Sequence, residues 1–141
     1  MVLICNLVYH ITLMNLPKKV FSRKDEITAE FLLLIDKHVK DLMAGRINRR
    51  YHASDFGALL FIHPRHLSNT IKLTTGKSPC DFMEERLYHE AEKLLLESAL
   101  PIAEIGFMFG YEEPTNFIKF FKSMAGSTPL QFRKRSMLKA E

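Results

Sequence analysis

The chain has 141 residues, enough for one ordinary domain or two very small ones, which excludes elaborate multi-domain machinery. With 47% hydrophobic and 26% charged residues it has a globular composition that excludes disorder and a fibrous repeat, and its net charge of +4 favours anionic partners only mildly. Its two distant cysteines, Cys5 and Cys80, argue against a disulfide framework and a thiolate metal site and favour the reducing cytoplasm.

The amino-terminal segment, residues 1–16, is mostly apolar, but it does not match a targeting segment. It lacks the basic start and small-residue cleavage site of a signal peptide, and it is short for a membrane span and interrupted by Asn6 and His10. Its apolar residues recur every three or four positions, which predicts an amphipathic helix that meets a partner, a second copy of the chain being one candidate. These residues are Ile4, Leu7, Ile11 and Met14.

Pro17 and the charged run 18–26 predict a linker, so we expect a domain boundary near residue 25. Residues 1–25 would then form a dimerisation helix with its linker, and residues 26–141 the main domain. A first helix of this domain, ending at Gly45, is predicted because its apolar residues fall on one face. These residues are Phe31, Leu34, Ile35 and Val39.

An internal repeat organises the main domain. Seven residues of one copy are answered, in the same order, fifty positions later. The residues of the first copy are Pro64, Leu67, Ile71, Lys72, Gly76, Pro79 and Phe82. Their counterparts in the second copy are Pro114, Phe117, Phe121, Lys122, Gly126, Pro129 and Phe132. Upstream, Gly57 matches Gly106 at an offset of forty-nine, so we expect one extra residue in the turn of the second copy. Such a repeat constrains the fold more than any single residue does.

The first copy predicts a helix-turn-helix over about 54–76. Ser54 is expected to cap a short helix that runs up to a turn at 61–63. Pro64 then opens a second helix, which Gly76 ends.

A long connecting helix, 78–98, is predicted next, because a Ser-Pro-Cys-Asp sequence supplies a capping residue, a first-turn proline and an acid. The second copy, about 101–124, predicts a short helix at 101–109, a turn at Gly110 and a second helix at 114–124. No strand pattern appears after the linker. The predicted fold is all-α, with about seven helices in two helix-turn-helix subdomains joined by the long connecting helix.

A helix-turn-helix recognises DNA because its second helix protrudes into the major groove, where base pairs are distinguishable. Both second helices have the apolar inner face and polar outer face that this requires. The inner residues are Leu67 and Ile71 in the first copy and Phe117, Phe120, Phe121 and Met124 in the second. The outer residues, suited to base edges and phosphates, are Arg65, Ser68, Asn69, Lys72, Thr115, Asn116, Lys119 and Lys122. Gly57 and Gly106 would let two helices approach closely beside each turn.

Residues 27–135 resemble the AraC/XylS family of transcription regulators. The resemblance rests on HPRHLSNTIK at 63–72, TGKSP at 75–79, AEKLL at 91–95, IAEIG at 102–106 with Gly110-Tyr111, NFIKFFK at 116–122 and GSTP at 126–129. Two differences are glycine at residues 57 and 106, where alanine is usual, and tyrosine at residue 111, where phenylalanine is usual.

The resemblance implies a bacterial, sequence-specific regulator that binds double-stranded DNA, with RNA polymerase as a further candidate partner and a location at the nucleoid. It implies that Arg65, Ser68, Asn69, Thr115 and Lys119 face bases, as we also expect for the outward Asn116, and that Lys72 and Lys122 face the DNA backbone. The connecting helix spans roughly 30 Å, close to one turn of B-DNA, so we expect the two units to read successive major grooves. Most members carry a sensing domain, and residues 1–16 resemble the last helix of that domain. Two interpretations stay open: the chain is a fragment of a longer regulator, or it is a naturally short member.

No catalytic residue, metal ligand or cofactor is predicted. His63 and His66 have a spacing that could hold a metal, but no cysteine or acid nearby completes a set of ligands. No nucleophile elbow accompanies the Ser, His and Asp residues. The aromatic stripe 117–132 is interpreted as core rather than as a platform for single-stranded bases. The alternative function is a helical protein-interaction module that keeps the fold without specific DNA binding.

Overall fold

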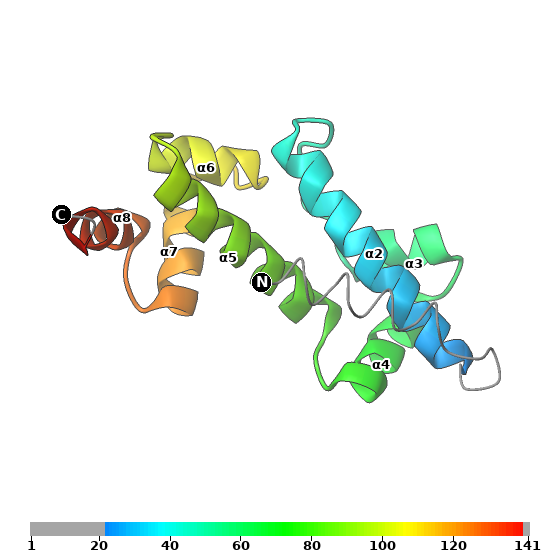
Figure 1. Ribbon diagram of the computed structural model, residues 1–141. Helices are drawn as coiled ribbons and strands as arrows, with labels where there is room; N and C mark the ends of the chain where they lie inside the picture. The colour runs from blue at the N-terminus through cyan, green and yellow to red at the C-terminus, as the bar shows by residue number, and fades with distance from the viewer. Residues whose placement is uncertain (1–21, 140–141) are drawn as a thin grey trace. The chain divides into compact units, whose positions relative to one another are not determined.

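The computed structural model of the chain describes residues 22–139, and these form seven α-helices and no strand (Figure 1). The helices are α2 (Arg23–Met43), α3 (Ala53–Leu60), α4 (Pro64–Thr75), α5 (Pro79–Glu97), α6 (Ile102–Met108), α7 (Pro114–Ala125) and α8 (Pro129–Lys139). The predicted all-α fold, with two helix-turn-helix pairs and a long connecting helix, is confirmed. The helix predicted for residues 1–16 lies outside the described residues.

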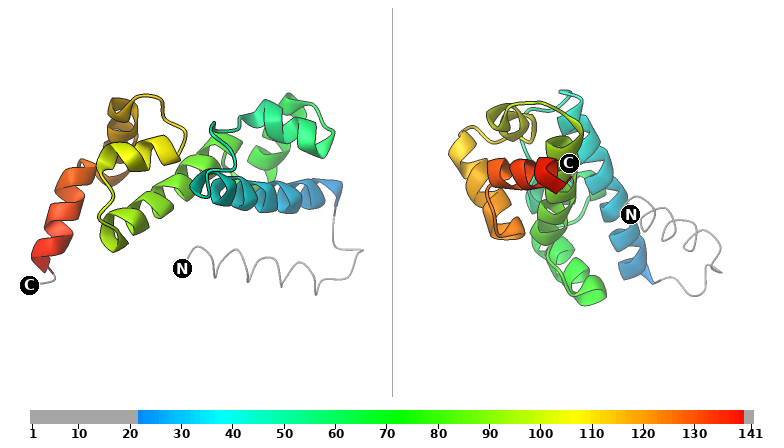
Figure 2. Two further views of the ribbon diagram at one scale, coloured as in Figure 1. Left: turned by 90° about the horizontal axis from the view of Figure 1, so that it is seen from above. Right: turned by 60° about the vertical axis from the view of Figure 1, so that its left-hand side comes forward.

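The described residues divide into two compact units, and each contains one copy of the repeat. The first unit combines the described residues up to Asp36 with Tyr51–Phe82, and the second combines Lys37–Arg50 with the residues from Met83 onward. In the first unit α3 packs against α4, and in the second α6 packs against α7 and α7 against α8 (Figures 1 and 2). The division falls within α2 and α5, so both helices contribute residues to both units.

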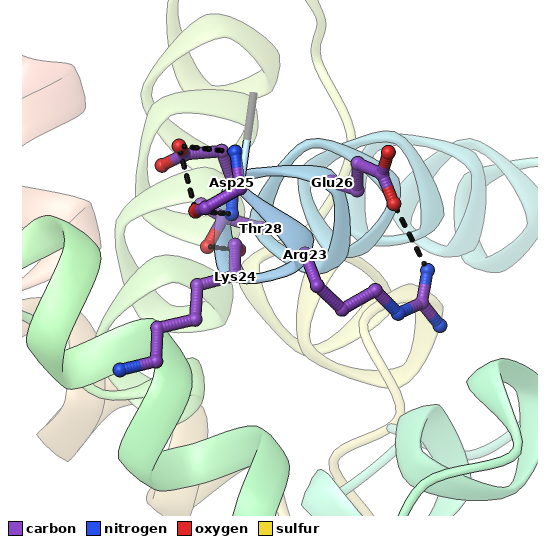
Figure 3. A network of polar contacts seen from close by, with 6 residues as sticks. Arg23, Lys24, Asp25, Glu26 and Thr28 are labelled. Atoms are coloured by element: carbon purple, nitrogen blue, oxygen red, sulfur yellow. Dashed lines mark hydrogen bonds and ion pairs between the residues drawn. The ribbon is translucent and has the colours of Figure 1, made fainter. Parts of the chain in front are cut away.

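Helix α2 begins at Arg23, so the predicted linker 18–26 is wrong for its last four residues. The backbone N–H of Ser22 donates to Asp25 Oδ2 at 3.2 Å, and the N–H of Asp25 donates back to Ser22 Oγ at 3.3 Å. This reciprocal capping box starts the helix three residues before residue 26. An ion pair of 3.3 Å between Arg23 and Glu26 lies in the same turn (Figure 3). The charged residues that suggested a linker are therefore the first turn of a helix.

Helix α3 begins at Ala53, and its N-cap is His52 rather than the predicted Ser54. The backbone N–H of His52 donates to Asp55 Oδ2 at 2.8 Å, and a carboxylate in the first turn is favoured by the helix dipole. Serine is a common capping residue, but the acid three residues after His52 decides where this helix starts.

The core of the first unit is formed by α2, α3 and α4. Phe31 on α2 packs edge-on against Phe56 on α3, with ring centroids 5.4 Å apart, and both side chains are buried. A hydrogen bond of 2.7 Å between Thr28 Oγ1 and Thr74 Oγ1 links α2 to the last turn of α4. Of the residues predicted to face inward on α2, Phe31, Ile35 and Val39 are buried and Leu34 is half-buried.

The core of the second unit is largely aromatic. Phe117 and Phe121 on α7 are fully buried, and Phe121 contacts Tyr88 on α5 at 5.3 Å and Phe132 on α8 at 5.4 Å between ring centroids. Burial, followed by a hydrogen bond to Glu92, raises the pKa of Tyr88 to about 12, so this phenol remains protonated within the cluster. The interpretation of the aromatic stripe as core is confirmed at these positions.

Candidate nucleic-acid interface

The turn of the first unit brings the start of α4 close to α3. After α3, Phe61 adopts the left-handed conformation (φ +58°), and the N–H of Ile62 donates to the Gly57 carbonyl at 2.9 Å. A Cβ atom on Gly57 would lie 2.8 Å from the Ile62 carbonyl oxygen, so glycine suits this backbone and the predicted close approach is confirmed. His63 caps α4, because its Nδ1 accepts the backbone N–H of Arg65 at 3.1 Å.

The turn of the second unit follows the same hydrogen-bond pattern. Gly110 adopts the left-handed conformation (φ +82°), and the N–H of Tyr111 donates to the Gly106 carbonyl at 3.0 Å. A Cβ atom on Gly106 would lie 3.0 Å from the Cβ of Phe117, which confirms the close approach predicted at this glycine too. Gly57 and Gly106 thus both accept a hydrogen bond from their turn and both lie in close contact, Gly57 with backbone atoms of Ile62 and Pro64 and Gly106 with the Phe117 side chain.

The burial of side chains repeats along the chain as the sequence does. Residues 64–82 and 114–132 have the same burial class at almost every pair of positions fifty apart. Each segment covers the second helix of its unit, the glycine that ends it and the start of the following helix. The exceptions are Thr70 with Phe120 and Lys77 with Ser127. Two helices of different composition therefore present outer faces at matching positions.

The outer face of α4 is polar and accessible over an apolar inner face, as predicted. Leu67 and Ile71 are fully buried. Of the predicted contact residues, Arg65, Asn69 and Lys72 are exposed and Ser68 is half-buried. Leu73, which was not predicted from the sequence, is 72% exposed and lines a shallow groove with Asn69 and Lys72. Its position four residues after Asn69 would have placed it on this face.

The outer face of α7 is also polar. The predicted contact residues Thr115, Asn116, Lys119 and Lys122 are all exposed. On the inner face Phe117 and Phe121 are buried and Phe120 is half-buried, but the assignment of Met124 to this face is wrong, because its side chain is 38% exposed. The half-buried Ala125, four residues after Phe121, continues the inner face instead.

Comparison with known proteins agrees with this geometry. A family described as a helix-turn-helix domain matches residues 57–135, more than half of the chain. The regulator GlxA of Rhizobium meliloti is 31% identical over 98 residues, which cover 70% of this chain and 30% of GlxA. The chain belongs to the AraC/XylS family of DNA-binding transcription regulators. It spans less than a third of the length of GlxA.

Solved structures of AraC/XylS-type domains are similar to this chain. The carboxy-terminal domain of AraT, a response regulator from Geobacillus stearothermophilus, is 28% identical with a TM-score of 0.70, over 81% of this chain and 88% of that domain. The DNA-binding domain of AdpA, solved in complex with a target DNA, shares the fold at 18% identity with a TM-score of 0.64, over 77% of this chain and 94% of that one.

Helices α4 and α7 differ in the charge that precedes them. Glu112 and Glu113, both exposed, separate Tyr111 from α7, whereas His63 alone separates Ile62 from α4, which confirms the extra residue predicted in the second turn. Two carboxylates at the start of α7 would repel phosphate, while an imidazole at the start of α4 would not. No role for this difference in charge was predicted from the sequence.

Helices α4 and α7 are each followed by a further helix with a capped start, α5 and α8, as the repeat predicts. In the first unit the N–H of Ser78 donates to Asp81 Oδ2 at 2.9 Å, and the N–H of Asp81 donates to Ser78 Oγ at 3.1 Å. In the second, the N–H of Thr128 donates to Gln131 Oε1 at 3.0 Å, and the N–H of Gln131 donates to Thr128 Oγ1 at 3.2 Å. Hydrogen bonds from the backbone and then the side chain of Ser78 hold the pKa of Asp81 below its usual range.

Between residues 22 and 139, no three His, Cys, Asp or Glu side chains lie where they could hold a metal ion. Within the same residues, no helix combines the length and the apolar character needed to cross a membrane. His63, one of two histidines with a metal-like spacing, caps α4.

Proposed function

We propose that the chain regulates transcription by binding a specific sequence of double-stranded DNA, with α4 and α7 as its reading helices. The observation that carries the proposal is the repeated burial pattern, which places polar side chains at matching outer positions of two helices with unrelated inner faces. A solvated helix surface has no need of such a match, whereas insertion into successive major grooves requires it. The chain acts in this proposal by binding, without a catalytic step and without a cofactor.

The proposed contacts follow from the chemistry of the outer faces. Arg65 can donate two hydrogen bonds to O6 and N7 of a guanine, and Asn69 can pair with an adenine. The remaining base contacts are assigned to Ser68 on α4 and to Thr115, Asn116 and Lys119 on α7. Lys72 and Lys122, which occupy equivalent positions near the ends of the two helices, are assigned to phosphates.

The two units are proposed to read an asymmetric site in two successive grooves. The connecting helix α5 has 19 residues, which corresponds to about 28 Å of helix and approaches the roughly 34 Å turn of B-DNA. Arginine occurs only on the first reading helix, so the first half-site should be the more specific. RNA polymerase, and a second copy of the chain bound through residues 1–16, are the further partners proposed, at the nucleoid.

The test is a selection of binding sites from random duplexes with the full chain, followed by footprinting. The expected result is one asymmetric site with two unlike segments about 10 base pairs apart. Inserting five base pairs between them should abolish joint protection, because the segments then lie on opposite faces of the duplex. Unchanged protection after that insertion would mean that a single unit engages DNA.

Salt dependence separates this function from the protein-interaction alternative. Phosphate contacts release counterions, so affinity for the selected duplex should fall steeply as salt rises. An apolar protein interface should respond little to salt. A selection that enriches no sequence, together with binding that is insensitive to salt, would overturn the proposed function.

A further inference from the structure

The second reading unit includes a loop from a distant part of the sequence. Lys37–Arg50, which comprises the end of α2 and the loop after it, belongs to the same compact unit as α6 and α7. The Arg50 guanidinium carbon lies 4.1 Å from the ring centroid of Tyr111, and Arg50 Nη1 donates to the Tyr111 hydroxyl at 3.1 Å. Tyr111 is the turn residue directly after Gly110, and its side chain is only 7% exposed. A cation therefore lies on the buried aromatic residue of the turn.

The backbone of the loop is equally close to this turn. A Cβ atom on Gly110 would lie 3.2 Å from the backbone nitrogen of Arg50 and 3.5 Å from the carbonyl carbon of Arg49. Glycine at residue 110 therefore serves both the left-handed turn and the approach of the loop. The contact of Arg50 with the turn is continuous from backbone to guanidinium.

The first residues of the loop are held by the end of α2. Asp41 accepts a hydrogen bond from Arg46 Nε at 2.8 Å and another from Lys37 Nζ at 2.8 Å. The backbone N–H of Arg46 also donates to the Asp41 carbonyl at 2.9 Å. The loop thus runs from a fixed point at Asp41 to the contact of Arg50 with Tyr111.

Tyr111 transmits this contact to the reading helix. Its ring stacks on Phe120, with centroids 5.9 Å apart and planes inclined by 28°, and lies 5.7 Å from the ring of Phe117. Both phenylalanines belong to α7, whose outer face carries Asn116 and Lys119. In the first unit the residue that matches Tyr111 is Ile62, which has no ring for a cation to contact.

We propose that Arg50 is a positioning residue for the second reading helix: it holds the turn before α7, and thereby the DNA-facing side chains of that helix, without contacting DNA itself. The inference rests on the proposed function, because it assigns Arg50 to only one of two DNA-reading units. It follows that loss of Arg50 impairs reading of the second half-site and leaves the first half-site unaffected.

The experiment compares affinities of the full chain for three duplexes: the selected site, the site with its first half scrambled, and the site with its second half scrambled. Arg50→Ala should lower affinity for the complete site by about tenfold, the scale of a cation–π contact with its hydrogen bond. It should leave affinity unchanged when the second half is scrambled. Hydroxyl-radical protection should be lost over the second segment alone. Arg23→Ala, which removes the same charge from the exposed start of α2, is the matched control and should show no difference between the halves.

Combination with a Tyr111 variant distinguishes positioning from a direct phosphate contact. If Arg50 acts through Tyr111, then Tyr111→Leu should lose the same half-site, and the double variant should lose no more than either single variant. Arg50→Lys, which keeps a cation over the ring, should retain most of the affinity. Additive losses from the two substitutions, or equal losses at both half-sites, would overturn the proposal.

Folding and function are separated by two further observations. Circular dichroism at the binding temperature should show each variant folded, and Arg50→Gln, which keeps much of the side chain without its charge, replaces the alanine variant if that one unfolds. A folded Arg50→Gln protein with wild-type protection of the second segment would refute the role of Arg50. Absence of sequence-specific binding by the wild-type chain would instead refute the proposed function.

Discussion

The two helix-turn-helix units follow the same hydrogen-bonded path with different side chains. The first turn places Phe61, 94% exposed, in the left-handed conformation, whereas the second places Gly110 there with the loop backbone packed against it. The inner face of α4 is aliphatic, and that of α7 is aromatic. Apart from the residues that recur in both copies of the repeat, the two units share the positions of buried and exposed side chains rather than the side chains themselves. The first unit thus has an exposed residue at its turn and an aliphatic inner face on α4, whereas the second has a turn in contact with a loop and an aromatic inner face on α7.

The largest expected difference concerns the cores. Phe117→Ala should destabilise the protein by about 3–5 kcal/mol, because it removes a fully buried ring that contacts Phe121 and Tyr111. Leu67→Ala, at the equivalent position of α4, should cost less, at the lower end of about 2–5 kcal/mol. Urea unfolding of both variants measures the difference. A larger loss at Leu67 than at Phe117 would contradict the view that the second unit depends more on its core.

The next comparison concerns DNA. Arg65→Ala should weaken binding to the selected site by about 1–3 kcal/mol and relax the preference at one base pair, since a bidentate contact to guanine is lost. Lys72→Ala should weaken binding to all duplexes evenly and reduce the salt dependence, since a phosphate contact carries no sequence information. Affinity measured across a set of single-base variants of the site separates the two. Equal, sequence-independent losses would show that Arg65 contacts only the backbone.

The two turns should respond in opposite directions to substitution. Phe61→Gly should stabilise the protein by up to about 1 kcal/mol, because glycine relieves the left-handed strain and the exposed ring loses little burial. Gly110→Ala should destabilise it by about 1–3 kcal/mol, because the new Cβ meets both an unfavourable φ and the Arg50 backbone nitrogen. Thermal unfolding gives both signs. Stabilisation by Gly110→Ala would mean that the loop does not pack against this turn.

The elements of the fold could be predicted because their signals are local. The prolines that open helices, the glycines that end them and the Ser78–Asp81 capping box act within a few residues, and each is found where the repeat predicts it. The limits of α2 and α3 were missed for the same kind of reason. The acid at the third position of each helix decides where the helix starts, more than the residue types from which the boundary was predicted. Asp55 shows this, because it accepts the N–H of His52 and makes His52 the cap of α3.

The candidate site could be predicted only in part. The outward positions of α4 and α7 follow from helical spacing, and the structure leaves these side chains accessible, but their roles toward DNA stay predictions. The contact of Arg50 with Tyr111 at the second turn could not be predicted from the sequence, because the two residues are 61 positions apart and Arg50 lies outside the repeat. A spacing rule describes one helix, whereas this contact depends on how a distant loop folds back onto the unit.

The smallest expected difference is between the capped starts of α5 and α8, whose stabilities should respond differently to acid. The folded-state pKa of Asp81 lies below its usual range, so the cap of α5 is fully effective above the unfolded-state pKa, about 4. Its contribution is lost as pH falls through the lower, folded-state value. Gln131, which caps α8 in the same way, does not ionise.

Between about pH 6 and pH 3, Asp81→Gln should therefore lose less stability than the wild type. The difference should be about 0.5 kcal/mol or less, because the Asp81 carboxylate is exposed and screened by solvent. Gln131→Glu should have the opposite effect, because it gives the start of α8 an acid-sensitive cap. The measurement is urea unfolding at several pH values, and identical pH profiles for Asp81→Gln and the wild type would remove Asp81 as the source of the difference.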